Sequence, residues 1–237
     1  MDQVECLEYL AGPVADRVRD APAVDDLTQD LQSLATTSMG VDTIERLLST
    51  DGTREAWEVG EAMAECFLED ELGVEWPWNT NRDRRTPRAS LPGADLVGFV
   101  DRGSGAEFAF GEVKTSEDDG TPPNVMTGRT GMIQQLEALA GNIEHHFTLI
   151  KWLHARCKNT EHWSSFQSAA ARYVSSSGRA IFLCGLLMRD TQPAELDLRN
   201  RAAAISATVA GPTSAHLTAW YLPVAIADWC VQAGLAS

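Results

Sequence analysis

The feature that most constrains the fold is a short glycine-containing bend between two apolar segments. Residues 94–101 and 106–115 have the apolar content typical of strands, and Arg102-Gly103-Ser104-Gly105 joins them. A Gly-Ser pair at the centre of a two-residue loop is typical of a tight type II′ turn, whose first position needs a positive φ. The two segments are therefore predicted to form an antiparallel hairpin.

The same bend fixes which residues of the two strands face each other. If Arg102 faces Gly105, counting outward along both strands places Asp95 opposite Glu112. Their Cβ atoms would then lie about 5 Å apart. Lys114 follows Glu112 by two residues, so the strand period of two puts both side chains on one face. Three ionisable groups are thus expected at one end of the hairpin.

The hairpin is apolar on both faces, which predicts that other elements cover both sides. One face carries Val97, Phe99, Phe108 and Phe110, and the other carries Leu96, Val100, Ala109 and Val113. Two carboxylates that face each other in such a place repel and destabilise the fold. A divalent cation such as Mg²⁺ removes that cost, because hard ions prefer carboxylate oxygens. The alternative is an ordinary ion pair between Glu112 and Lys114, with Asp95 merely starting the strand.

The order of predicted elements indicates an α/β fold with a mixed central β-sheet flanked by helices. From residue 54 onward we expect elements over 54–72 (helix), 74–78 (edge strand), the hairpin, 132–155 and 163–174 (helices), 180–188 (strand), 195–209 (helix), 215–222 (strand) and a short helix from 224. Residues 1–50 have helical spacing and are expected to form an acidic N-terminal extension, with residues 51–237 as the main domain.

The segment Pro92-Gly93-Ala94-Asp95, followed after sixteen residues by Glu112-Val113-Lys114, resembles the PD-(D/E)XK nuclease superfamily. The resemblance implies a restriction-endonuclease-like core over residues 54–188. It implies that Asp95, Glu112 and the carbonyl of Val113 hold Mg²⁺, with Mn²⁺ as an alternative. It also implies that Lys114 positions the attacking water.

Members of the superfamily often add two further site residues, a glutamate and a glutamine, from neighbouring helices. For the glutamate, on the helix before the first strand, we choose Glu61, with Glu65 as the alternative on the same face. For the glutamine, on the helix after the second strand of the hairpin, we choose Gln134, with Gln135 as the alternative.

The function that the resemblance implies is Mg²⁺-dependent hydrolysis of phosphodiester bonds, with DNA as the expected substrate. The size and motif layout are similar to those of bacterial anti-phage systems such as Hachiman, in which a small nuclease pairs with a helicase. The protein is therefore expected to be the effector of an antiviral defence or restriction system. The alternative is a catalytically inactive protein of the same fold that acts as a binding or assembly subunit of a helicase-containing complex.

Charge is distributed very unevenly along the chain. The net charge is −15, and residues 1–80 alone contain 19 acidic and 4 basic side chains. An acidic surface repels phosphate, so this part is not expected to contact nucleic acid. It is expected to be either a solvated surface or a docking surface for a basic partner such as a helicase-like subunit.

Arginines are the residues expected to contact the nucleic acid backbone, because a guanidinium suits bidentate contacts with phosphate. The predicted nucleic-acid-binding residues are Arg82, Arg84, Arg85, Arg88 and Arg129. For the cluster before Asp95, the alternative role is to neutralise the acidic N-terminal region.

Cysteine and hydropathy patterns bear on the compartment. Five cysteines are scattered without a C-x-x-C pair, which is typical of a reducing cytoplasm. No apolar run approaches the roughly 18 residues of a membrane span, and no secretion signal is recognisable, so a cytoplasmic protein is expected. Histidines between residues 145 and 162 are expected to pack beside tryptophans rather than to bind zinc.

Overall fold

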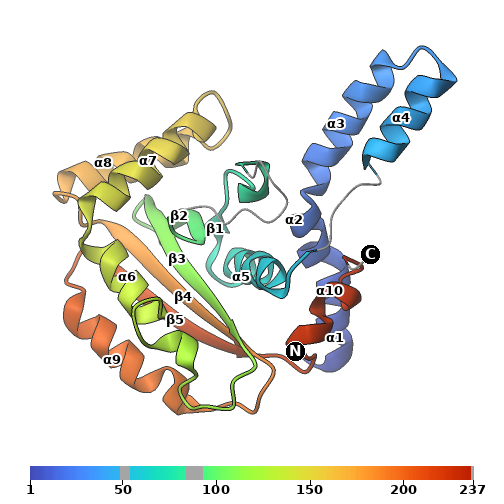
Figure 1. Ribbon diagram of the computed structural model, residues 1–237. Coiled ribbons are helices and arrows are strands. Elements are labelled where there is room, and N and C mark those ends of the chain that lie inside the picture. The colour runs from blue at the N-terminus through green and yellow to red at the C-terminus, as the bar shows by residue number, and fades with distance from the viewer. Residues whose placement is uncertain (49–53, 84–92, 236–237) are drawn as a thin grey trace.

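The computed structural model describes residues 1–48, 54–83 and 93–235. Its centre is a mixed β-sheet of five strands in the order in which they occur along the chain (Figure 1). The strands are β1 (Val74–Glu75), β2 (Leu96–Asp101), β3 (Ala106–Ser116), β4 (Ile181–Arg189) and β5 (Ser214–Tyr221). β1, β2 and β3 pair antiparallel, whereas β4 pairs parallel with β3 and β5 pairs parallel with β4. The predicted α/β fold with a mixed central sheet is confirmed.

Helices cover both faces of this sheet. One face packs against α1 (Gln3–Tyr9), the π-helical η1 (Leu10–Val14), α2 (Ala15–Arg19), α5 (Ala56–Leu72) and α10 (Trp229–Gln232). The other packs against α6 (Met132–Gly141), α7 (Ile143–Cys157), α8 (Trp163–Ser175) and α9 (Arg199–Thr208). Short 3₁₀ turns are η2 (Thr80–Asp83), η3 (Asn124–Met126), η4 (Glu195–Asp197) and η5 (Ile226–Asp228). None of the described helices combines the length and the apolar character that a bilayer-spanning segment requires.

The predicted register of the hairpin is confirmed, and so is the covering of both faces. Leu96 faces Gly111 at one end of the β2–β3 ladder, and Asp101 faces Ala106 at the other. The phenylalanine-rich face lies in the core beneath α6, α7 and α8, and the opposite face lies in the core beneath α5. The hairpin therefore has the alternation that the sequence predicts.

The turn itself differs from the prediction. Pairing ends at Asp101 and Ala106, so residues 102–105 form a four-residue loop rather than a two-residue turn. The Asp101 side chain closes this loop, because its Oδ1 accepts the N–H groups of Gly103 at 2.8 Å and Gly105 at 3.2 Å. Both glycines have positive φ, the conformation that glycine tolerates without steric cost.

The predicted long helix over residues 132–155 is two helices, α6 and α7. Asn142 separates them and is the N-cap of α7, since its Oδ1 accepts the N–H groups of Glu144 at 2.9 Å and His145 at 3.2 Å. Asparagine is among the best N-cap residues, but the continuous apolar spacing hides the break in the sequence. The break matters because it opens the corner between the two helices.

The predicted N-terminal extension over residues 1–50 divides into two parts. Residues of α1, η1 and α2 are buried in the main core, among them Leu10, Val14 and Val18. By contrast, α3 (Ala21–Leu34) and α4 (Ser38–Leu48) have no buried residue and extend away from the sheet as a helical pair (Figure 1). For the described residues, a boundary near residue 20 therefore fits the packing better than one at residue 50.

A test of the packing concerns Gly60, where α5 lies close to β3. A Cβ atom at this position would lie 2.5 Å from Cγ2 of Thr115. We expect Gly60→Ala to lower the free energy of unfolding by about 1–3 kcal/mol, the usual cost of overpacking. Adding Thr115→Ser removes the clashing methyl group and should recover most of this loss. Urea unfolding measures both.

The control for this test is Gly141→Ala in α6, where an added Cβ meets no atom within 4 Å. This variant should be neutral or slightly stabilising because alanine favours helix. Equal effects of the two glycine substitutions would contradict the close approach of α5 to the sheet.

Candidate functional site

Three of the predicted site residues lie together where the β2–β3 pairing begins. Asp95 immediately precedes β2, and Glu112 and Lys114 lie in β3. The Lys114 Nζ is 3.2 Å from Oε2 of Glu112 and 4.0 Å from Oδ2 of Asp95. The register brings the two carboxylates together, and the strand period brings in the ammonium group.

Asp95 is held by the backbone of the opposite strand. Its Oδ2 accepts the N–H of Val113 at 2.9 Å. In a strand the N–H and C=O of one residue point to the same side, so the Val113 carbonyl is directed toward the same edge of β3 as Asp95. This edge has no ladder partner there, because described pairing with β2 begins only at Leu96 and Gly111. The predicted carbonyl ligand thus has a suitable direction.

Glu112 is the electrostatically strained member of the group. Only 2% of its side chain is exposed, whereas Asp95 and Lys114 keep 27% and 18%. Burial and the nearby Asp95 raise the pKa of Glu112 to about 8, although Lys114 lowers it in part. The Lys114 ammonium group therefore does not offset burial and the second carboxylate, and folding favours the protonated form of Glu112.

This donor set suits a hard divalent cation such as Mg²⁺, which takes one or two carboxylates plus other oxygen atoms. Within residues 1–48, 54–83 and 93–235, no three His, Cys, Asp or Glu side chains are placed to hold a metal ion together. The donors that the described residues offer at this position are the carboxylates of Asp95 and Glu112 and the carbonyl of Val113.

The two candidate glutamates of α5 do not join this group. α5 packs against the sheet face opposite to Glu112 and Lys114. Glu61 lines a small separate cavity that Glu65 and Arg17 also line. Glu65 is buried and pairs with Arg17 at 3.2 Å, and its burial raises the pKa of Glu65 to about 7. Glu61 and Glu65 therefore share a helix face as predicted, and this face lines a cavity with Arg17.

Of the two candidate glutamines, the structure places Gln135 beside Glu112 and leaves Gln134 exposed. Gln135 and Glu112 line the same cavity, which has a volume of about 270 Å³ and lies against α6 and α7. Three residues of α7, His145, Thr148 and Leu149, also line it. Nothing in the sequence places these three residues at the site, because their position depends on the break at Asn142.

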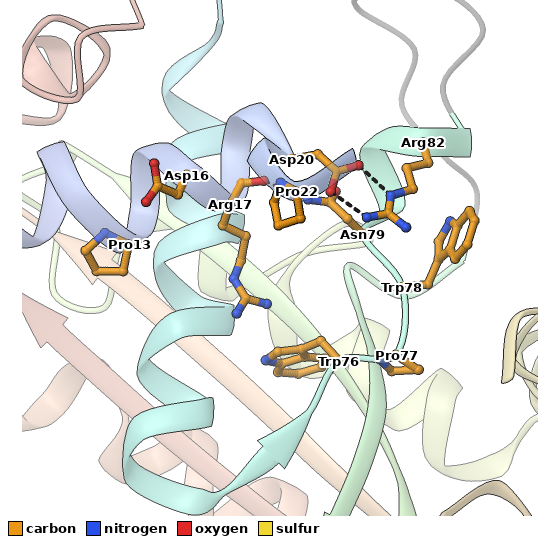
Figure 2. A pocket seen from close by; sticks show the side chains of 10 residues that line it. All are labelled: Pro13, Asp16, Arg17, Asp20, Pro22, Trp76, Pro77, Trp78, Asn79 and Arg82. Atoms are coloured by element: carbon orange, nitrogen blue, oxygen red, sulfur yellow. Dashed lines mark hydrogen bonds and ion pairs between the residues drawn. The ribbon is translucent and has the colours of Figure 1, made fainter. Parts of the chain in front are cut away.

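Arg82 takes the alternative role that the sequence left open, neutralising the acidic N-terminal region. Its Nη2 lies 2.8 Å from Oδ1 of Asp20, and its guanidinium carbon lies 4.8 Å from the centre of the Trp78 ring. Figure 2 shows this ion pair at a cavity of about 320 Å³ between α2 and the segment that follows β1. The positive charge of Arg82 is thus already matched by a carboxylate.

Of the remaining predicted arginines, the structure describes only Arg129. Arg84, Arg85 and Arg88 lie outside the described residues. Arg129 is exposed in the loop before α6, and its side chain makes no hydrogen bond or ion pair with another described residue. Arg129 is therefore accessible to solvent, as a side chain that contacts phosphate must be.

The packing beside a tryptophan that is expected for the histidines is confirmed for His154 but not for His146, which packs against other aromatic rings. His146 is buried, contacts the Tyr173 hydroxyl through Nδ1 at 2.8 Å and stacks on Phe110. His154 lies edge-on to Trp163 with ring centres 5.5 Å apart. The His146 ring is thus buried, whereas His154 lies exposed on α7.

Comparison of the chain with protein-family models, with curated proteins and with solved structures gave no match. The functional argument therefore rests on the geometry of Asp95, Glu112, Lys114 and their surroundings.

The raised pKa of Glu112 predicts a pH dependence of stability. In the folded protein the pKa is about 8, above the ordinary value of 4.5. The stabilising contribution of the protonated carboxyl is full below pH 4.5 and is lost as the pH rises through 8. In the presence of a chelator, we expect the wild-type protein to lose stability across this range and Glu112→Gln to lose much less.

Urea unfolding between pH 5 and pH 9 provides the measurement. Glu117→Gln is the matched control, because Glu117 is exposed and the variant should follow the wild-type curve. If wild type and Glu112→Gln had parallel pH profiles, Glu112 would not be the strained carboxyl described above.

Proposed function

We propose that the protein is a Mg²⁺-dependent nuclease of the PD-(D/E)XK type that hydrolyses phosphodiester bonds of DNA. The observation that carries this proposal is the meeting of Asp95, Glu112 and Lys114 at the end of a hairpin whose register follows from the sequence. The arrangement of α5 before the hairpin and α6 after it, on opposite faces of a mixed sheet, is compatible with a restriction-endonuclease-like core.

Each side chain has a distinct part in this proposal. Asp95, Glu112 and the Val113 carbonyl would hold the cation, Mg²⁺ or Mn²⁺. When bound, the cation supplies Lewis-acid polarisation of the phosphate and lowers the pKa of a water molecule. Lys114 lies beside both carboxylates, so its ammonium group can donate a hydrogen bond to the attacking water and hold it toward phosphorus. Positioned donors of this kind stabilise the charge that develops on the reacting oxygens.

The setting that we propose is a bacterial antiviral defence or restriction system, with a helicase-like subunit as partner. What supports a partner is the α3–α4 pair, which exposes large apolar side chains such as Leu34, Met39 and Leu47. The same helix pair carries Asp25, Asp26 and Asp30 on α3, so a partner surface that is apolar and basic would fit. Exposed apolar groups of this kind commonly mark interaction sites.

The proposal predicts that Lys114→Ala abolishes cleavage without unfolding the protein. We expect purified wild-type protein to cut supercoiled plasmid with Mg²⁺ and to be inactive with a chelator. Removal of a positioned donor should reduce the rate by roughly 100-fold or more. Lys151→Ala is the matched control, because Lys151 is exposed on α7, whereas the Lys114 ammonium group lies beside both carboxylates.

Thermal unfolding of both lysine variants verifies that they remain folded. Plasmid cleavage at the wild-type rate by Lys114→Ala would contradict the catalytic account. It would favour instead the alternative of a catalytically inactive protein that serves a helicase-containing complex.

Cation binding predicts a second pH dependence, opposite in sign to that of the cation-free protein. Mg²⁺ competes with the proton for Glu112, whose pKa is about 8. The rise in Tm on addition of Mg²⁺ should therefore be small at pH 6 and large at pH 9. Differential scanning fluorimetry at several pH values measures this rise, and Glu112→Gln should abolish it. A Tm rise that is the same at every pH, or that survives in Glu112→Gln, would place the cation elsewhere.

A further inference from the structure

A cavity of about 270 Å³ lies beside Glu112, and binding of a cation by the two carboxylates does not require it. It lies in the corner that the break between α6 and α7 opens. Residues on three elements line it, with Glu112 from β3, Gln135 and Ala138 from α6, and Thr148 and Leu149 from α7. One wall of the cavity therefore belongs to the proposed catalytic site.

The walls of the cavity divide into apolar and polar parts. Ala138, Leu139 and Leu149 present hydrocarbon, whereas Gln135 and Thr148 present hydrogen-bonding groups. A nucleobase has the matching form, with flat apolar faces and an edge of donors and acceptors. Apolar side chains of this kind pack against the faces of a base that has left the stack.

Gln135 contains a polar atom that lacks a partner. Its Oε1 is buried and accepts no hydrogen bond from the described residues. A buried acceptor without a donor is unfavourable, so such an atom calls for a ligand or a water molecule. Every base has an N–H group on its Watson–Crick edge that could donate to it, and glutamine amides commonly read bases in this way.

The size and position of the cavity limit what it can hold. Pockets for whole drug-sized ligands measure roughly 300–1,000 Å³, so a cavity of about 270 Å³ suits a single base better than a complete nucleotide. Gly93, two residues before Asp95, also lines it. A base in the cavity would therefore place its sugar and phosphate near the two carboxylates.

We propose that this cavity binds one unstacked nucleobase next to the phosphate that is cut. The inference rests on the proposed nuclease function and specifies its substrate: a strand with an unpaired nucleotide, as in single-stranded DNA, a frayed end or a flipped base. Gln135 is then the residue that contacts the edge of the base, and Ala138 and Leu149 contact its faces.

The test compares two probes that differ only in the base, deoxyadenosine 5′-monophosphate and 2-deoxyribose 5-phosphate. Isothermal titration calorimetry in Mg²⁺ should give at least tenfold tighter binding of the nucleotide to wild-type protein. Ala138→Trp fills the cavity from an exposed helix position and should remove this difference, and Gln135→Ala should reduce it several-fold. Ala203→Trp, at an exposed position of α9, is the matched control and should bind as wild type does.

The outcomes separate this inference from the nuclease proposal. Equal affinity of wild-type protein for the two probes, or an Ala138→Trp variant that is folded and keeps the full difference, would overturn the base site even if plasmid cleavage proceeds. Tighter nucleotide binding that Ala138→Trp removes would support the site even if no cleavage were seen. If circular dichroism shows that Ala138→Trp is unfolded, Thr148→Trp fills the same cavity from α7 and gives the same comparison.

Discussion

The pairing of β2 with β3 is the constraint on which the rest of the account depends. Because the ladder runs from Leu96 opposite Gly111 to Asp101 opposite Ala106, the next pair along the hairpin is Asp95 and Glu112. A shift of one residue would move every side chain of one strand to the other face and separate the carboxylates. Apolar side chains on both faces prevent such a shift, since it would exchange residues between two differently shaped cores.

The surroundings of the pair determine its chemistry. Glu112 is buried against α6 and α7, and among the described residues its ion-pair partner is the Lys114 ammonium group at 3.2 Å. Two neighbouring carboxylates with one ammonium group between them destabilise a fold. Natural chains keep such pairs mainly where function needs them. The break at Asn142 places a cavity beside Glu112, so the carboxylate and the cavity lie on the same side of the sheet.

The sequence predicts best those features that depend on a few neighbouring residues, such as a turn or the alternation of a strand. The glycine bend predicts the register, which the pairing of Leu96 with Gly111 and of Asp101 with Ala106 confirms. Strand alternation predicts the two faces of the hairpin. These features depend on backbone conformation and period alone, so no knowledge of the other elements is needed.

Side chains on helices were predicted less well, because their direction depends on how each helix packs. Neighbouring residues differ by about 100° around a helix, so the choice between Gln134 and Gln135 required the position of α6 against β3. Glu61 and Glu65 share a face as predicted, yet α5 turns that face toward Arg17. Likewise, the ion pair of Arg82 with Asp20 joins segments 62 positions apart in sequence, which composition does not reveal.

The most direct test of the account is a crystal structure of the protein soaked with Mn²⁺, located by its anomalous scattering. The account predicts a peak between the carboxylates of Asp95 and Glu112, within coordination distance of the Val113 carbonyl. Crystals saturated with Mn²⁺ that show no peak there, with the Lys114 ammonium still bridging the two carboxylates, would contradict it.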